Sequence, residues 1–157
     1  MVLSLKAHCF SCGLLTLIPL KPKAATQDEV WPYYPKKLLS QPEQVLYHRL
    51  VEALPDHLVF AQVQLSRLLG VKKGHDYRAW LNRINRMSAD FVVCRKDGSV
   101  VAVIELDDQS HQKAERQAAD TKKDRALSSA GIRLIRWQVK AMPDLEAIKA
   151  AFADATT

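Results

Sequence analysis

Three acidic residues stand at the ends of apolar stretches of the sequence. Asp90 lies near the start of the β-branched stretch 89–96, and Glu105 and Asp107 lie at the end of a second one, 99–106. Carboxylates on neighbouring strands repel one another unless a cation or a proton lies between them. Carboxylate oxygens and water suit Mg²⁺ or Mn²⁺, which activates water for attack on a phosphate and stabilises the developing charge. We therefore expect these three carboxylates to hold a divalent metal ion.

A hairpin would bring the three acids together. The Asp-Gly pair at 97–98 separates the two stretches and is typical of a two-residue turn. In that register Lys96 faces Ser99, and Asp90 faces Glu105 on the same face of the sheet. The third acid, two residues beyond Glu105, points the same way if its strand continues.

Both faces of this hairpin are apolar, so helices should cover both. One face carries Phe91, Val93, Ala102 and Ile104, and the other carries Val92, Cys94, Val101 and Val103. Spacing and turn signals predict further strands at 58–65 and 132–139 and helices at 40–54, 75–87, 111–130 and 144–152. The first helix begins with a capping box from Ser40 to Glu43. These elements predict an α/β fold with a central mixed sheet of about four strands, flanked by helices on both faces.

The first 37 residues are expected to lie outside the folded domain, which spans 38–157. Residues 7–20 are apolar but shorter than the roughly 20 residues of a membrane span, so a weak secretory signal and a membrane-anchor remnant both stay open. Residues 21–42 are rich in proline and aromatic side chains and read as a linker on the domain surface. Cys9 and Cys12 have the spacing of half a zinc site, which only His8 and Cys94 could complete, so two cysteines in an apolar tail is the preferred interpretation.

Composition favours a polyanionic partner. The chain has a net charge of +6 and 25% charged residues, which suits nucleic acid. Three cysteines are too few for a secreted disulfide framework, so a reducing, cytoplasmic location is expected, with membrane association through residues 1–20 as the alternative. Five cations on and before the second helix are candidates to grip phosphates: Lys72, Lys73, Arg78, Arg83 and Arg86. The alternative is that they form only a solvated face.

Three segments resemble a known family. They read ADFVV at 89–93, VIELDDQSH at 103–111 and DTKK at 120–123. In this pattern the chain, from about Leu38 to Phe152, resembles the domain of unknown function 2726. That family is placed among the PD-(D/E)XK, restriction-endonuclease-like nucleases and is similar in pattern to the very-short-patch repair endonucleases.

The resemblance implies roles for individual residues. It places metal binding on Asp90 and Glu105, but the motif's lysine position holds Asp107. Lys123 could replace that lysine from the following helix, where it shares a face with Asp120 and the apolar Leu127. Histidine acts as general acid or base in repair endonucleases of this type, which makes His111 the other candidate to handle protons.

Each of these residues also has a simpler structural interpretation. Glu43, whose accessory role would follow from the superfamily's first-helix acid, could serve only its capping box. Asp120 and Lys123 could form a solvated ion pair, and His111 could simply occupy the first turn of its helix.

Together these features predict a Mg²⁺-dependent (or Mn²⁺-dependent) endonuclease that hydrolyses nucleic-acid phosphodiester bonds, most readily those of DNA. The alternative is a module of the same fold that binds nucleic acid or assembles with partners without turnover. The missing motif lysine is the best support for that alternative.

Overall fold

The computed structural model describes residues 30–108 and 114–153, and for residues 114–120 only the backbone is described. The chain divides into two units, 1–35 and 36–157. In the first unit the described residues 30–35 form neither helix nor strand, and the rings of Trp31 and Tyr33 lie 5.7 Å apart. The second unit contains all the helices and strands described below.

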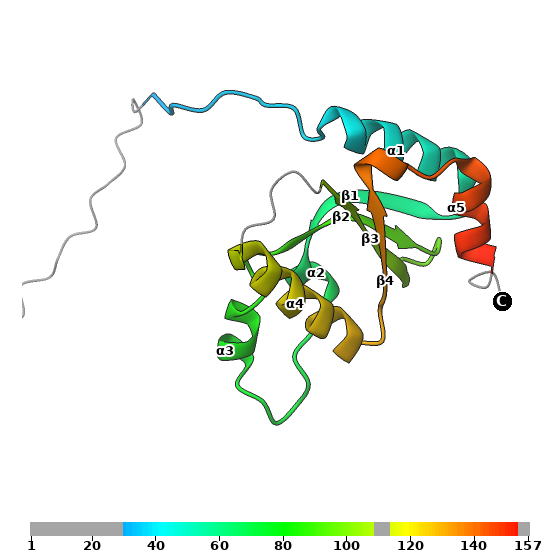
Figure 1. Ribbon diagram of the computed structural model, residues 1–157. Coiled ribbons are helices and arrows are strands. Elements are labelled where there is room, and N and C mark those ends of the chain that lie inside the picture. The colour runs from blue at the N-terminus through cyan, green and yellow to red at the C-terminus, as the bar shows by residue number, and fades with distance from the viewer. Residues whose placement is uncertain (1–29, 109–113, 154–157) are drawn as a thin grey trace, which may run out of the picture. The chain divides into compact units, whose positions relative to one another are not determined.

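The second unit is built around one four-stranded mixed sheet (Figure 1). Its strands lie in the order β1-β2-β3-β4; the first three are antiparallel, and β4 runs parallel to β3. The strands are β1 (Leu58–Gln64), β2 (Ser88–Cys94), β3 (Val100–Asp107) and β4 (Arg133–Gln138). The helices are α1 (Gln41–Ala53), α2 (Leu65–Leu68), α3 (Tyr77–Asn82), α4 (Ala114–Ser129) and α5 (Leu145–Phe152), with a 3₁₀ turn at Val139–Ala141.

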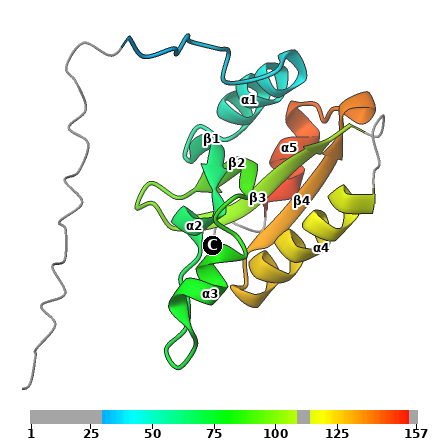
Figure 2. The same cartoon turned by 90° about the vertical axis from the view of Figure 1, so that its left-hand side faces the viewer.

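Helices cover both faces of the sheet, so the predicted α/β fold is confirmed (Figures 1 and 2). On one face α1 and α5 contribute Leu46, Leu50 and Ile148 to a core that includes Phe91 and Ile104. On the other face the buried Leu65 of α2 and Leu127 of α4 pack with members of β2 and β3, among them Val92 and Val103. A strand buried on two faces is positioned more rigidly than one exposed on one face.

The β2–β3 hairpin differs from the predicted two-residue turn. The Arg95 N–H donates to the Ser99 carbonyl at 2.8 Å, so the loop has three residues and Lys96 does not face Ser99. Gly98, the last residue of the loop, adopts φ +85°. A left-handed residue at this position is typical of a three-residue hairpin loop.

A β-bulge then restores the predicted register. Val93 pairs with Ala102 while Cys94 pairs with Val100, so Val101 is an extra residue in β3. It packs with the same core as Ala102, not on the opposite face as predicted, because the two residues of a bulge can share a side. Beyond the bulge Phe91 faces Ile104, and the same register, continued by one residue, would set Asp90 opposite Glu105.

One predicted helix is shorter than expected, and one short helix was not predicted. The helix predicted at 75–87 is confined to α3, because the chain then forms turns, closed by hydrogen bonds such as Ile84 N–H to the Leu81 carbonyl and Met87 N–H to the Ile84 carbonyl, before it enters β2. The short α2 was not predicted at all. By contrast, Gly131 ends α4 as expected: it adopts φ +70°, and the following Ile132 N–H donates to the Leu127 carbonyl.

Candidate metal and nucleic-acid site

The candidate site lies where β2 begins and β3 ends. These two ends are adjacent because the strands are antiparallel. Asp90, the third residue of β2, accepts a hydrogen bond at its Oδ2 from the Leu106 N–H of β3, at 2.9 Å. That bond ties the Asp90 carboxylate to the strand that carries Glu105.

Glu105 is the only charged or polar side chain that is buried among the described residues, at 5% exposure. Its Oε2 accepts a hydrogen bond from Lys123 Nζ of α4 at 2.5 Å, and the Lys123 side chain is itself only 13% exposed. Burial raises the pKa of Glu105 to about 7, although the hydrogen bond and charge of Lys123 oppose that rise. Lys123 and Leu127, which helical spacing sets on one face of α4, both lie on its inner side, since Leu127 is fully buried.

The second oxygen of this carboxylate, Glu105 Oε1, is buried and has no hydrogen-bond partner in the described part of the chain. A buried carboxylate oxygen without a donor is costly, and a bound ligand or ion removes that cost. Glu105 therefore has one oxygen held by Lys123 and one oxygen without a protein donor among the described residues.

Asp90 is the second acid of the site. Burial raises its pKa, the Leu106 N–H and the charge of Lys123 lower it, and the charge of Glu43 raises it. The charge of Asp90 in turn contributes to the raised pKa of Glu105. The two acids therefore interact, as two ligands of one cation would before the cation binds.

Glu43 makes two hydrogen bonds, one to the N-cap of α1 and one to β1. Its Oε2 accepts from the Ser40 N–H at 2.6 Å, which is one half of the predicted capping box. Its Oε1 accepts from Gln62 Nε2 at 2.9 Å, and the Gln62 side chain also lowers the pKa of Asp90. The first helix is thus connected to the site through one glutamine.

Gln62 is a residue that sequence reasoning missed. It is the only non-glycine residue with positive φ, at 53°, among the described residues, and it lies inside β1. A left-handed backbone costs a non-glycine residue roughly 1–2 kcal/mol and recurs at functional sites. Its neighbours Ala61 and Val63 pair with Phe91 and Ala89, so Gln62 stands beside Asp90. The alternation of the strand gave no sign of this conformation.

Asp107 takes a different partner from the other two acids. Its Oδ1 lies 3.3 Å from Arg136 Nη1 of β4, and Arg136 Nη2 donates to Asp124 of α4 at 2.6 Å. Within the described ranges no group of three His, Cys, Asp or Glu side chains is arranged to hold a metal ion. The structure thus brings Asp90 and Glu105 together with Lys123, and pairs Asp107 with Arg136, a residue the sequence analysis did not select.

Two carboxylates still fit a hard divalent cation. Mg²⁺ commonly binds one or two protein carboxylates and fills its other positions with water and substrate phosphate. The unpartnered Oε1 of Glu105 is the observation in favour of that fit, and the neighbouring Asp90 would supply the second ligand. Asp107 would then act at a distance, by fixing Arg136 beside the site.

The remaining predicted site residues are placed as follows. The five candidate phosphate-binding cations, Lys72, Lys73, Arg78, Arg83 and Arg86, are all exposed. Asp120 lies in α4, but only its backbone is described, and His111 lies outside the described residues. Cys94 is a buried free cysteine of the core, while His8, Cys9 and Cys12 are outside the described ranges. None of the described helices has the length and apolar character needed to cross a membrane.

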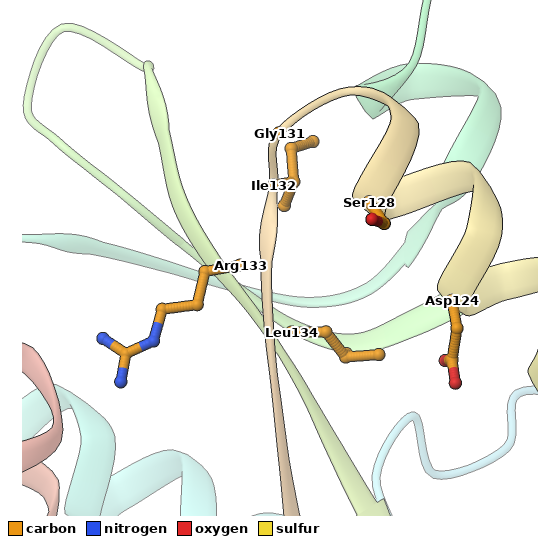
Figure 3. A pocket seen from close by; sticks show the side chains of 6 residues that line it. All are labelled: Asp124, Ser128, Gly131, Ile132, Arg133 and Leu134. Atoms are coloured by element: carbon orange, nitrogen blue, oxygen red, sulfur yellow. The ribbon is translucent and has the colours of Figure 1, made fainter.

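A pocket of about 460 Å³ lies elsewhere, between the end of α4 and the start of β4 (Figure 3). It is lined by Asp124, Ser128, Gly131, Ile132, Arg133 and Leu134. Arg133 and Leu134 point to opposite sides of β4, as successive strand residues do (Figure 3). Because Arg133 pairs with Ala102 and Gln138 pairs with Asp107, this pocket is at the other end of β4 from the acids. We do not assign it to the candidate site.

The fold and the site define an α/β domain with a buried glutamate–lysine pair at the end of a mixed sheet. Comparison with known proteins identifies its family: the family described as "Protein of unknown function (DUF2726)" matches residues 35–156. The chain belongs to that family. No curated protein and no solved structure matches the chain significantly.

Proposed function

We propose that this protein is a metal-dependent phosphodiesterase that cuts nucleic acid, with Asp90 and Glu105 as the metal ligands. The observation that carries the proposal is the buried Glu105 carboxylate, which is held by Lys123 on one oxygen and has no protein donor on the other among the described residues. A residue with a strongly raised pKa beside a second acid and a lysine is a candidate functional group.

The chain's own residues have separate tasks in this proposal. The Leu106 N–H and Gln62 hold the Asp90 carboxylate in place, and Glu43 holds Gln62. Lys123 supplies positive charge beside Glu105, where a scissile phosphate would gain negative charge. A bound Mg²⁺ would supply an activated water and a second source of charge stabilisation. His111 and Asp120 stay candidates for proton transfer and for orienting Lys123.

The resemblance to PD-(D/E)XK nucleases supports this assignment of roles. In that pattern a strand acid, a second strand acid and a lysine lie together, and here Asp90, Glu105 and Lys123 lie together. The lysine comes from α4 instead of β3, where Asp107 takes its place. DNA is the expected substrate, and a cleavage assay on both DNA and RNA distinguishes it from RNA.

A second candidate function is a nucleic-acid-binding module without turnover. It is favoured by Asp107, which stands at the motif's lysine position and is paired with Arg136. It is also favoured by the ion pair of Glu105, because a stable pair with Lys123 satisfies part of the carboxylate without a metal.

Cleavage and stability assays separate the two. The wild-type chain, Glu105→Gln and the control Asp56→Asn would be incubated with Mg²⁺ or Mn²⁺ and with single-stranded, duplex and mismatched DNA and RNA. Asp56 suits the control because it is exposed and paired only with the exposed Lys96 among the contacts of its carboxylate that the structure gives. We expect metal-dependent cleavage that Glu105→Gln reduces at least about 100-fold and Asp56→Asn leaves unchanged.

The same proteins give a readout that does not depend on turnover. A metal ion that binds only the folded state raises the melting temperature. We expect millimolar Mg²⁺ to raise it in the wild type and in Asp56→Asn, and not in Glu105→Gln. Nucleic-acid binding with no metal-dependent cleavage and no metal-dependent melting shift would reject the enzyme and favour the binding module.

A further inference from the structure

Residues 69–87, between α2 and β2, form a projecting cationic segment that the proposed catalytic site does not use. In both views this segment, coloured green, extends away from the sheet and carries α3 (Figures 1 and 2). None of the residues of α3 is buried. At its base the Leu65 N–H donates to the Met87 carbonyl at 2.9 Å, and Gln64 Nε2 donates to the Asn85 carbonyl. The segment is therefore an anchored arm with little core of its own.

Two aromatic side chains on this arm are open to solvent. Tyr77 is 60% exposed and Trp80 is 45% exposed. Arg83 lies over the Trp80 ring, with its guanidinium carbon 4.1 Å from the ring centroid, and the His75 ring meets the Trp80 ring edge-on at 5.9 Å. Stacking of this kind orders the ring and the cation together without burying them. Large exposed aromatic groups that are held in place mark binding surfaces.

The charge of the arm is strongly one-sided. Within 69–87 there are five Lys or Arg residues and one acid, Asp76, a net of +4 from a chain whose total is +6. The single acid is already used, since Asp76 Oδ1 accepts from the Ala79 N–H at 3.0 Å and caps α3. The arm therefore offers a cationic surface with flat aromatic groups set into it.

We infer that this arm binds single-stranded or locally unpaired nucleic acid, with bases stacked on Trp80 and Tyr77 and phosphates held by the surrounding cations. Base stacking on aromatic side chains needs bases whose faces are free, which duplex DNA does not offer. A surface for duplex backbone alone would need the cations but would gain nothing from the exposed rings. An acidic peptide would also match the charge, but it would not use the ring faces.

The arm's position suits the proposed site. β2 begins at Ser88, directly after the arm, and Asp90 lies three residues beyond Met87. Three residues of strand span roughly 10 Å. Nucleic acid that is bound on the arm and reaches its base at Met87 would thus lie near the candidate metal ligands. The inference rests on the proposed function in taking nucleic acid as the partner, and it adds the class of substrate.

The test is binding in EDTA, so that cleavage does not interfere. The probes are a fluorescein-labelled dT oligonucleotide of 12 nucleotides, a duplex of 12 base pairs, and a labelled poly-glutamate peptide, each titrated with the full chain and followed by anisotropy. We expect the single strand to bind more tightly than the duplex. We expect Trp80→Ala to weaken single-strand binding about tenfold and duplex binding by less than twofold, because the stacking energy is lost only where bases stack.

Two further variants keep the test decisive. Trp80→Phe retains a ring and should keep most of the single-strand affinity, which answers the objection that Trp80→Ala merely loosens the arm. Phe60→Ala is the matched control, since Phe60 is an aromatic residue of similar exposure, 47%, that lies on β1. It should leave single-strand binding unchanged.

The outcomes separate this inference from the proposed function. The inference is overturned by equal binding of single strand and duplex, by no effect of Trp80→Ala, by tighter binding of the peptide, or by no binding of any probe. Cleavage that depends on Glu105 but not on Trp80 overturns the inference and leaves the proposed function standing. Single-strand binding that depends on Trp80, without any cleavage, supports the inference and overturns the proposed function.

Discussion

At the scale of single residues, Glu105 is the most informative group of the molecule. An ion pair that only stabilised the fold would be expected to lower the pKa of its carboxylate. Here Lys123 lies 2.5 Å away, yet burial and the charge of Asp90 still raise the pKa of Glu105. The lysine therefore does not fully offset the cost of burying the acid. A divalent cation between Asp90 and Glu105 would do so.

The raised pKa predicts how stability depends on pH. Glu105 changes from an ordinary pKa of 4.5 to about 7 in the folded protein. Between these values the folded state holds a proton that the unfolded state releases, so the free energy of unfolding falls as pH rises through this window. The full effect is roughly 3 kcal/mol at pH 8 relative to pH 4. Urea unfolding in EDTA at pH 5 and pH 8 measures it.

Glu105→Gln isolates this contribution. Glutamine stays neutral and resembles the protonated acid, so the variant should lose less stability between pH 5 and pH 8 than the wild type does. The exposed acid of Asp56→Asn is the control and should keep the wild-type pH dependence. The same fall in stability in Glu105→Gln and in the wild type would show that Glu105 is ionised throughout this range.

Sequence reasoning reached some of these residues and missed others for physical reasons. Lys123 could be placed because helical spacing puts it on one face with Leu127, whose burial fixes that face inward. Arg136 could not be placed, because its proximity depends on the parallel register that sets it beside Glu105. Gln62 could not be placed, because strand alternation gives no sign of a positive φ inside β1.

At the scale of elements, the β2–β3 hairpin shows two errors that cancel. The predicted two-residue turn is in fact a three-residue loop, which shifts the pairing by one residue. The bulge at Val101 shifts it back, so Phe91 meets Ile104 as predicted. The position of the acids was thus obtained correctly from a turn that was wrong. A bulge has no simple sequence signature, since an extra valine in a run of valines looks like its neighbours.

The hairpin loop gives a prediction with a matched control. Gly98 has φ +85°, and a Cβ added to it meets no atom within 4 Å. Gly70 has equally open surroundings but does not have a positive φ. Gly98→Ala should therefore lower the free energy of unfolding by about 1–2 kcal/mol through backbone strain alone. Gly70→Ala should leave it unchanged or raise it by about 0.5 kcal/mol, because the unfolded chain loses freedom.

Urea unfolding of the two variants beside the wild type measures both changes. Equal losses in Gly98→Ala and Gly70→Ala would mean that the positive φ of the loop is not what stabilises this turn.

The helices show the same division between strong and weak local signals. α1 begins with a capping box and α4 ends at a glycine, and both helices were predicted. α2 has four residues and no side-chain cap, and it was not predicted.

At the scale of the whole molecule, the question is whether the excess positive charge acts locally or everywhere. A net charge of +6 would attract any polyanion through its long-range field. The structure places five exposed cations on or beside one projecting arm that leads into β2, next to Asp90. If the arm is the binding surface, removal of its charges should have a larger effect than removal of the same charge elsewhere.

The salt dependence of binding tests this. Each phosphate neutralised on a single strand contributes roughly −0.7 to the slope of log affinity against log salt concentration. Lys72→Gln with Lys73→Gln should make the slope shallower by roughly 1.4, measured with the labelled dT oligonucleotide between about 50 and 200 mM salt. Lys36→Gln with Lys37→Gln removes two equally exposed lysines outside the arm and also lowers the net charge from +6 to +4. This control should keep the wild-type slope, because counterions are released only where cations meet phosphates. Equal slopes in the two double variants would mean that the whole surface attracts nucleic acid and that the arm has no special part in binding.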